Sequence, residues 1–181
     1  MTTVQTPQQG GDDKEIETHG GRKRKTKGEQ GLVVVSQNFR GGLREEDKRE
    51  EVMMQMKRRS INIVCGQESG LPEKFTMKRW DTGELLLSCG NNFKKGCKAS
   101  MCFFMDRGTA ELFIKGGSNV KSLGPRLATI LIPMHKRTVH FINSHFPDSG
   151  QKKITLDEYK IKVEGVLQRV QRRDLLVWLR E

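Results

Sequence analysis

The sequence lacks several features that define other classes of protein. No apolar run approaches the roughly 20 residues that a helix needs to cross a bilayer. Residues 1–31 contain no apolar stretch of the kind that forms a signal peptide. These absences, with a mean hydropathy of -0.64, argue against a membrane or secreted protein. We expect an intracellular protein, and 181 residues are enough for one domain with its own core.

A zinc or disulfide framework is also missing. The sequence has no C-x-x-C pair, and its four histidines do not lie at zinc-finger spacing from the cysteines. One cysteine ends the apolar run 61–65, where a thiol packs as a small hydrophobic group. We therefore interpret all four as core or surface thiols: Cys65, Cys89, Cys97 and Cys102.

Positive charge is in excess. The net charge is +11, yet residues 1–31 hold six basic and five acidic residues, so +10 belongs to the rest of the chain. A folded domain this basic tends to attract polyanions; the alternative is a solvated surface without a partner, and charge alone does not decide between them. Residues 1–31 are polar throughout and predict a disordered tail. Their basic run 22–25 (RKRK) is a candidate nuclear localisation signal.

The pattern changes to buried secondary structure after this tail. The β-branched run 32–35 suits a strand buried on both faces, and the run 61–65 predicts a second one. Between them, a charged segment from Glu45 carries Val52 and Met56 at helical spacing, which predicts a helix with a core-facing stripe. Strand, helix and strand in succession form the βαβ pattern, which places two parallel strands side by side.

Short strands dominate the chain from Trp80 onward, and the turn residues between them indicate antiparallel hairpins. An apolar stripe predicts a second helix from Leu156 to about Arg173. The strand candidates are 84–89, 99–105, 109–114, 127–133, 138–143 and, after that helix, 174–178. The expected fold class is α/β, with mixed sheets and two main helices.

Polar side chains follow the two neighbouring strands of the βαβ unit. Asn38 follows the first strand and Glu68 the second, and α/β sheets place their sites beyond the carboxyl ends of such strands. A carboxylate beside an amide is an incomplete Mg²⁺ site, because that ion takes one or two carboxylates and fills its other positions with water and phosphate. Taken singly, Glu68 is typical of a surface acid and Asn38 of a turn residue. Their joint position predicts a site.

A third candidate is the segment 143–150 (NSHFPDSG), which contains His145 and lies at the end of the apolar strand 138–143. A histidine there can donate to a phosphate oxygen or serve in acid–base chemistry. His135 and His140 lie in or beside a predicted hairpin, and we interpret both as structural.

Four segments now align with one family. Segment 35–44 (VSQNFRGGLR) is similar to the S-W-N-V-x-G-L-R strand and loop that open apurinic-site endonucleases and their relatives. Segment 61–69 (INIVCGQES) resembles their D-I-L-C-L-Q-E-T, and segment 142–150 (INSHFPDSG) resembles x-x-A-Y-V-P-N-x-G. Segment 124–127 (GPRL) is similar to a G-R-x-hydrophobic strand entry. The order matches over about residues 32–178, and the chain resembles the DNase I-like endonuclease/exonuclease/phosphatase family.

The resemblance implies a fold, a cofactor and roles for four residues. The fold is a four-layered α/β sandwich, partial here, and the activity is cleavage of phosphodiesters or phosphomonoesters with Mg²⁺ or Mn²⁺. Glu68 would bind the metal directly, and Asn38 would support the metal and its water or orient a catalytic side chain. Arg126 and His145 would contact the substrate phosphate, while the metal neutralises charge that develops in the transition state.

The chain departs from the family pattern at three points. Gln37 replaces a tryptophan, and Asp148 replaces an asparagine that contacts phosphate. The third departure concerns the family's second half. Strand 174–178 lies where the strand leading into the family's G-D-x-N motif is expected, but neither that motif nor the later S-D-H motif is present. Since G-D-x-N prepares the nucleophile, we expect little or no hydrolysis by residues 32–181 alone.

Three functional hypotheses remain open. The first is a truncated part of a nuclease-like phosphoesterase that acts on nucleic acid, of retroelement or cellular origin. The second is a non-enzymatic nucleic-acid-binding remnant. The third is a lipid or inositol phosphatase of the same family, which the charge of the body disfavours because a small substrate needs no extended basic surface. The sequence identifies neither the substrate nor the oligomeric state.

Overall fold

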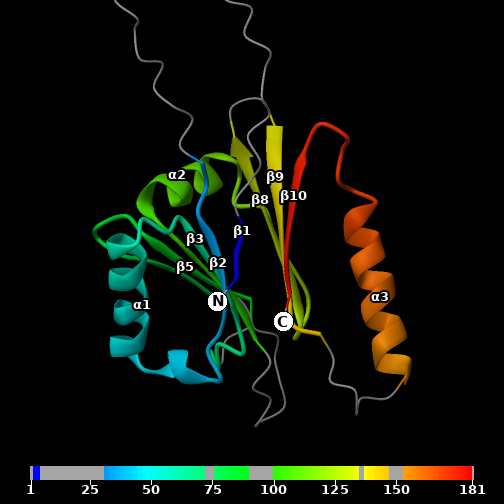
Figure 1. The fold of residues 1–181 in the computed structure, drawn as a ribbon, viewed down its shortest axis with the longest axis horizontal. Helices are drawn as coiled ribbons and strands as arrows, with labels where there is room; N and C mark the ends of the chain where they lie inside the picture. The colour runs from blue at the N-terminus through cyan, green and yellow to red at the C-terminus, as the bar shows by residue number, and fades with distance from the viewer. Residues whose placement is uncertain are drawn as a thin grey trace, which may run out of the picture.

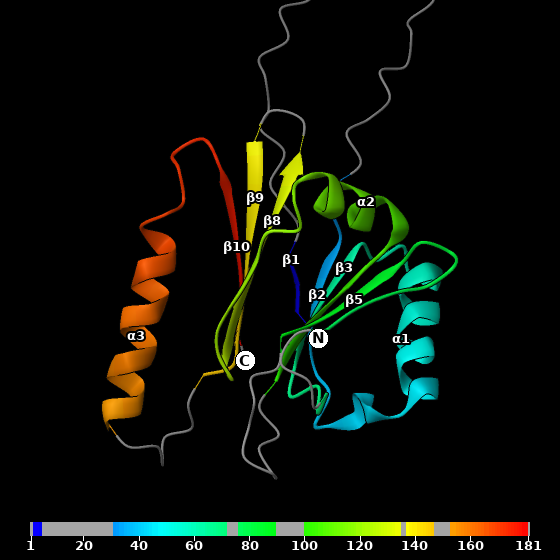
Figure 2. The same ribbon diagram turned by 180° about the vertical axis from the view of Figure 1, so that it is seen from behind.

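The computed structural model describes residues 2–4, 31–71, 76–89, 100–134, 137–146 and 153–180. These residues form two sheets that face one another, with α1 (Glu46–Arg58) outside one sheet and α3 (Lys153–Leu167) outside the other (Figure 1). The view from behind shows the same four layers (Figure 2). The basic run 22–25, most of the predicted tail, Cys97, His135 and Asp148 lie outside the described residues.

The first sheet has six strands in the order β1-β2-β3-β6-β5-β4. Only β2 and β3 are parallel, and the other pairs are antiparallel. The strands are β1 (Thr2–Val4), β2 (Val34–Asn38), β3 (Ile63–Gln67), β4 (Thr76–Arg79), β5 (Leu85–Cys89) and β6 (Met101–Met105). Two of them were not predicted: β4, and β1, which lies within the segment predicted to be a tail.

The βαβ prediction is confirmed. Helix α1 joins β2 to β3 and packs on the outer face of the sheet, with Met56 only 2% exposed and Val52 against the same apolar cluster. Acidic residues occupy its first turn and basic residues its last turn, as the helix dipole favours. Both strands extend further than the apolar runs that predicted them, so that Asn38 and Gln67 are their last residues.

The second sheet has four strands in the order β10-β9-β8-β7. Strands β8 and β9 form a long antiparallel hairpin, while β10 pairs in parallel with β9 because α3 makes the crossover between them. Helix α3 covers the outer face with Tyr159, Val163 and Val166, which pack against Leu127 and Ile142. The strands are β7 (Val120–Gly124), β8 (Leu127–Met134), β9 (Arg137–Ser144) and β10 (Leu175–Arg180).

One predicted strand is wrong, since 109–114 belong to helix α2 (Arg107–Lys115). Asp106 caps this helix by accepting a hydrogen bond from the backbone N–H of Thr109 at 2.8 Å. The buried residues Thr109, Ala110 and Phe113 recur at helical spacing, and Phe113 enters the core between the sheets. The described residues therefore contain three α-helices, one more than expected. Helix α3 also ends earlier than predicted, at Leu167.

The core between the sheets is apolar and includes two cysteines. Cys65 and Cys89 are fully buried in it, and Cys102 is buried on the other face of the first sheet. Burial raises the pKa of the Cys65 thiol well above its ordinary value and that of Cys89 to about 12, so both stay protonated at neutral pH. These are core thiols, as predicted. Among the described helices, none is long and apolar enough to span a membrane.

Candidate phosphate and metal site

The site begins at the edge of the first sheet where the parallel strands β2 and β3 both end. Asn38 and Gln67 are register partners, so the loops that follow them start side by side. The two loops are joined by backbone hydrogen bonds from Gly41 N to Glu68 O at 2.6 Å and from Leu43 N to Ser69 O at 3.1 Å. Loops tied in this way hold their side chains in fixed positions.

A glycine contact sets how closely the two loops approach. Gly70 has a φ of +75°, and a Cβ on it would lie 2.7 Å from the Cα of Gly41. Glu68, two residues earlier, also has a positive φ, of 48°. A left-handed conformation is costly for a residue with a side chain, and such conformations cluster at functional sites.

Glu68, Arg126 and His145 come together from three separate segments. Oε1 of Glu68 lies 3.7 Å from Nε2 of His145, and Nη1 of Arg126 lies 3.2 Å from Nδ1 of the same ring. Arg126 also donates to the carbonyl of Phe146 at 3.0 Å, and its own carbonyl accepts from His145 N at 2.9 Å. The side chain of Glu68 is 25% exposed and that of His145 is 11% exposed, so the group is open to solvent on the carboxylate side.

Asn38 lies beside this group but is engaged locally. Its Oδ1 accepts a hydrogen bond from the backbone N–H of Arg40 at 2.9 Å, which forms a turn at the end of β2. No hydrogen bond joins the Asn38 side chain to Glu68 in the described part of the chain. The sequence therefore placed both residues at the correct edge of the sheet, and the structure gives their side chains different immediate partners.

The donor set suits a hard cation only in part. Among the described residues, no group of three His, Cys, Asp or Glu side chains could hold a metal ion. Glu68 is the one carboxylate of the group, and Mg²⁺ accepts one or two carboxylates when water and phosphate fill its other positions. Asn38 Oδ1 is an oxygen donor with a second lone pair. One carboxylate and one amide fit the first part of a magnesium or manganese site.

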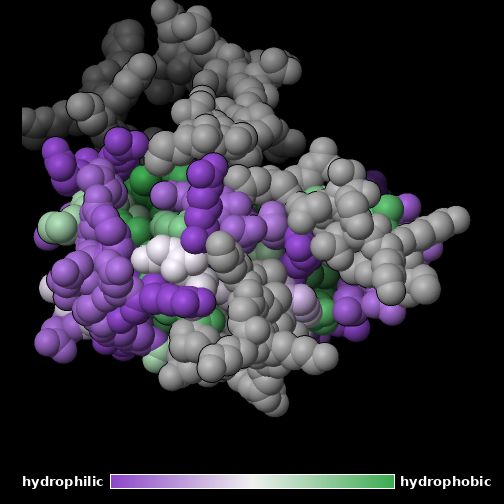
Figure 3. All heavy atoms as spheres, turned by 90° about the horizontal axis from the view of Figure 1, so that it is seen from below, coloured by the Kyte–Doolittle hydropathy of each residue, from purple (hydrophilic) through white to green (hydrophobic). Residues whose placement is uncertain are grey.

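The sequence predicted no role for two buried amides, although both stand in its candidate segments. Gln67 and Asn143 are both 0% exposed, and Gln67 Nε2 donates to Asn143 Oδ1 at 2.6 Å across the space between the sheets. The available signal was a polar residue directly after an apolar run, at the end of β3 in one case and near the end of β9 in the other. Figure 3 views the molecule from this end, where the described surface is mostly hydrophilic with smaller apolar areas.

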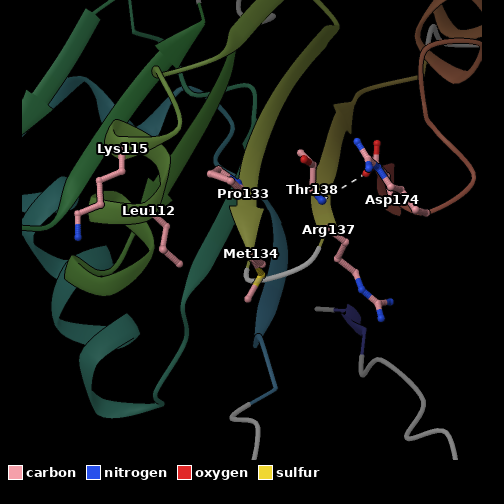
Figure 4. Close-up of a pocket in the computed structure, with 8 residues that line it drawn as sticks. Leu112, Lys115, Pro133, Met134, Arg137, Thr138 and Asp174 are labelled. Atoms are coloured by element: carbon pink, nitrogen blue, oxygen red, sulfur yellow. Dashed lines mark hydrogen bonds between the residues drawn. The ribbon is translucent and has the colours of Figure 1, made fainter.

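Among the described residues, a pocket of about 430 Å³ lies at the opposite end of the β8–β9 hairpin (Figure 4). Lys115 and Arg137 line it but point away from one another, so they do not converge on a single anion. Asp174, also in its lining, is bound to His140, with Nε2 of the ring 3.0 Å from Oδ2. His140 thus has the structural role expected for it, and this pocket contains none of the predicted site residues.

The architecture is that of a DNase I-like protein. The AP endonuclease LMAP from Leishmania major superimposes with a TM-score of 0.55 at 13% identity, over 81% of this chain and 54% of that one. An endonuclease/exonuclease/phosphatase family protein from Leptotrichia buccalis C-1013-b gives 0.52 at 12% identity, over 83% and 66%. D. rerio TDP2, solved in complex with a single-strand DNA product, gives 0.50 at 9% identity, over 82% and 59%.

These likenesses show the fold, and the chain spans between 54% and 66% of the length of the three structures. A comparison with protein-family models and with curated proteins finds no match. The prediction of a DNase I-like α/β sandwich is confirmed.

Proposed function

We propose that this chain is the N-terminal part of a divalent-metal-dependent phosphodiesterase domain that acts on nucleic acid. The observation that carries the proposal is the grouping of Glu68, His145 and Arg126, with contacts of 3.7 and 3.2 Å, at the end of the sheets. A carboxylate facing an imidazole and a guanidinium offers a cation site beside an anion site, which is what a metal-bound phosphate needs.

Each residue has a role that follows from its geometry. Glu68 would bind the metal, and Asn38 would hold a metal-bound water or use its second lone pair on the ion. Arg126, anchored by Phe146 and His145, presents a planar guanidinium that suits two phosphate oxygens. When bound, the metal would supply charge neutralisation at the phosphate. In the family, the residue that prepares the nucleophile belongs to the G-D-x-N motif, which residues 32–181 do not contain. We therefore expect little or no hydrolysis by these residues alone.

Nucleic acid is the substrate class that charge and fold similarity favour together. The chain outside the tail carries +10, and a polyanion is the partner that such a surface attracts. TDP2, one of the proteins with this fold, was solved with a single-strand DNA product. A small lipid or inositol phosphate would not need charge spread over the whole body.

A second candidate is a binding module without catalysis. The observation in its favour is that Glu68 stands as a single carboxylate, with no three-residue metal-binding group among the described residues. Such a module would bind nucleic acid through its basic surface, with a strong dependence on salt and none on a divalent cation.

Binding measurements on the full chain test the proposal. Mn²⁺ titrated by electron paramagnetic resonance should bind the wild type and bind Glu68→Gln about tenfold or more weakly, as loss of a direct carboxylate ligand predicts. Glu164→Gln, an exposed acid on α3, is the matched control and should bind as the wild type. Fluorescently labelled single-stranded DNA should bind more tightly with Mn²⁺ than with EDTA. Equal Mn²⁺ affinity in both variants would overturn the metal assignment, and DNA binding unaffected by EDTA would favour the binding module.

A further inference from the structure

The two sheets are joined at the site by a pair of buried amides. Gln67 is the last residue of β3 in the first sheet, and Asn143 is the penultimate residue of β9 in the second sheet. Besides the 2.6 Å hydrogen bond between them, Gln67 Nε2 donates to Ser36 Oγ at 2.9 Å. Asn143 Nδ2 donates to the carbonyls of Gly66 at 2.9 Å and Cys102 at 3.1 Å. We call Gln67 and Asn143 the amide clamp.

The clamp is placed directly behind the candidate site. Gln67 immediately precedes Glu68, and Asn143 lies two residues before His145. Residues two apart along an extended chain point to the same side, and Asn143 faces the first sheet, as its bonds to Gly66 and Cys102 show. His145, two residues further along, lies on the same side of the chain and faces Glu68. Each half of the clamp is therefore coupled through a short, rigid piece of backbone to one half of the Glu68–His145 pair.

Apolar packing alone would not specify this arrangement. Facing sheets normally lie about 10 Å apart with interdigitated apolar side chains between them, and such contacts carry no direction. The amide clamp is directional, since Asn143 Nδ2 bonds to two adjacent strands, β3 and β6, and its Oδ1 bonds to Gln67. Gln67 Oε1 is buried without a hydrogen-bond partner among the described residues, a cost that an apolar pair would avoid.

We propose that Gln67 and Asn143 are positioning residues whose inter-sheet hydrogen bond sets the distance between Glu68 and His145. The expected effect on the affinity for a divalent cation rests on the proposed function. The expected effect on the distance between Glu68 and His145 does not. Loss of the clamp would let the end of β9 shift relative to β3 while the apolar core between the sheets stays packed.

Two readouts test the clamp, one of geometry and one of binding. In the wild type, nuclear Overhauser contacts should connect the His145 ring with the Glu68 side chain. In Asn143→Leu and in the double variant Gln67→Leu/Asn143→Leu these contacts should be lost, and Mn²⁺ affinity should fall about tenfold or more, as for residues that orient metal ligands. Ser36→Ala removes only the support of Gln67 and should change both readouts in the same direction by less.

Ser88→Ala is the matched control. Ser88 is 1% exposed on β5 of the same sheet, and its Oγ has no partner among the described residues, so its loss removes a buried hydroxyl that makes no hydrogen bond to the clamp. It should preserve both readouts.

The double variant removes both amides together, which is tolerated better than leaving one amide unpaired. If Asn143→Leu does not fold, the double variant and Ser36→Ala carry the test.

The outcomes separate this proposal from the proposed function. Retention of the His145–Glu68 contacts in a folded double variant overturns the clamp, whatever the affinity. A wild type that shows these contacts but binds no Mn²⁺ overturns the metal role of Glu68, while loss of the contacts in the variants still supports the clamp. A loss of stability in the double variant with unchanged contacts would show that the amides only hold the fold together.

Discussion

Arg126 Nη1 lies 3.2 Å from Nδ1 of His145, and this contact determines the tautomer of the ring. A guanidinium can only donate, so Nδ1 must accept, and a neutral ring then carries its proton on Nε2. Nε2 is the atom that faces Glu68 at 3.7 Å, a distance too long for a direct hydrogen bond. The ring therefore directs an N–H donor into the space beside Glu68, where the proposed function would place a phosphate oxygen.

The tautomer predicts different effects for two amide substitutions at His145. The longer side chain in His145→Gln would place an amide N–H donor near the position of Nε2, whereas His145→Asn would place its amide near Nδ1 and leave the Nε2 position empty. We expect His145→Gln to retain more affinity for inorganic phosphate than His145→Asn, with a loss in His145→Asn of about 1 kcal/mol or more for the missing hydrogen bond to a charged group. Isothermal titration with phosphate measures both. Equal affinities for the two variants would contradict the assignment of the proton to Nε2.

Gly70 predicts the stability of the paired loops. A Cβ at this residue would lie 2.7 Å from backbone atoms of Gly41, and its φ of +75° is unfavourable for any side chain. Gly70→Ala should therefore destabilise the fold by about 2 kcal/mol or more, from the left-handed backbone and the clash together. Gly42→Ala is the control, because a Cβ there meets nothing within 4 Å and its φ is not positive. Urea denaturation measures the unfolding free energy of both variants. Equal stability of Gly70→Ala and Gly42→Ala would show that the two loops separate easily.

The sequence predicted those features whose signal is local. Asn38 and Glu68 could be placed together because two β-branched runs around a helical segment define parallel neighbours, and the ends of such strands meet. His145 and Arg126 could be placed near them only through the family resemblance, because the second sheet reaches the first through long-range packing. Strand β7 was missed because Val120–Gly124 carries few apolar residues, and its register is taken from β8.

The amide clamp and helix α2 illustrate what local patterns leave open. Gln67 and Asn143 are 76 residues apart, and a polar residue in a strand does not show what it faces across the core. The segment 109–114 has apolar residues that fit either a strand or one face of a helix, and over so few residues the two periods are ambiguous. The deciding feature was Asp106, whose side chain accepts a hydrogen bond from the free N–H of Thr109 in the first turn of the helix.

The contacts of Asp106 allow us to predict how much unfolding free energy is lost when the N-cap of α2 is removed. Its Oδ1 accepts from Thr109 N at 2.8 Å and its Oδ2 accepts from Asn62 Nδ2 at 2.8 Å, so it ties α2 to the start of β3. Asp106→Ala should cost about 1–2 kcal/mol of unfolding free energy, and Asp106→Ser should recover part of this because serine also caps helices. Asp81→Ala, an exposed turn acid, should be close to neutral. Thermal and urea unfolding measure the series; a neutral Asp106→Ala would contradict the role of the cap.

Asp174 predicts how stability depends on pH at the opposite end of the sheet. Burial favours the protonated carboxyl, but the hydrogen bonds from His140 and from the backbone N–H groups of Thr138 and Gln171 outweigh it, so the pKa of Asp174 is lowered from 3.8. A carboxyl with a lower pKa in the folded state stabilises the fold above its unfolded pKa, and this contribution is lost as the pH falls through the folded value.

The wild type should therefore lose stability relative to Asp174→Asn as the pH is lowered below about 4, and the difference between them should have reached its full size by about pH 5. Urea denaturation midpoints of both proteins across this range give the measurement. Asp157→Asn, an exposed acid on α3, should follow the wild type at every pH. A gap between wild type and Asp174→Asn that stays unchanged down to about pH 2 would mean that the carboxyl is not stabilised in its charged form by the contacts with His140, Thr138 and Gln171.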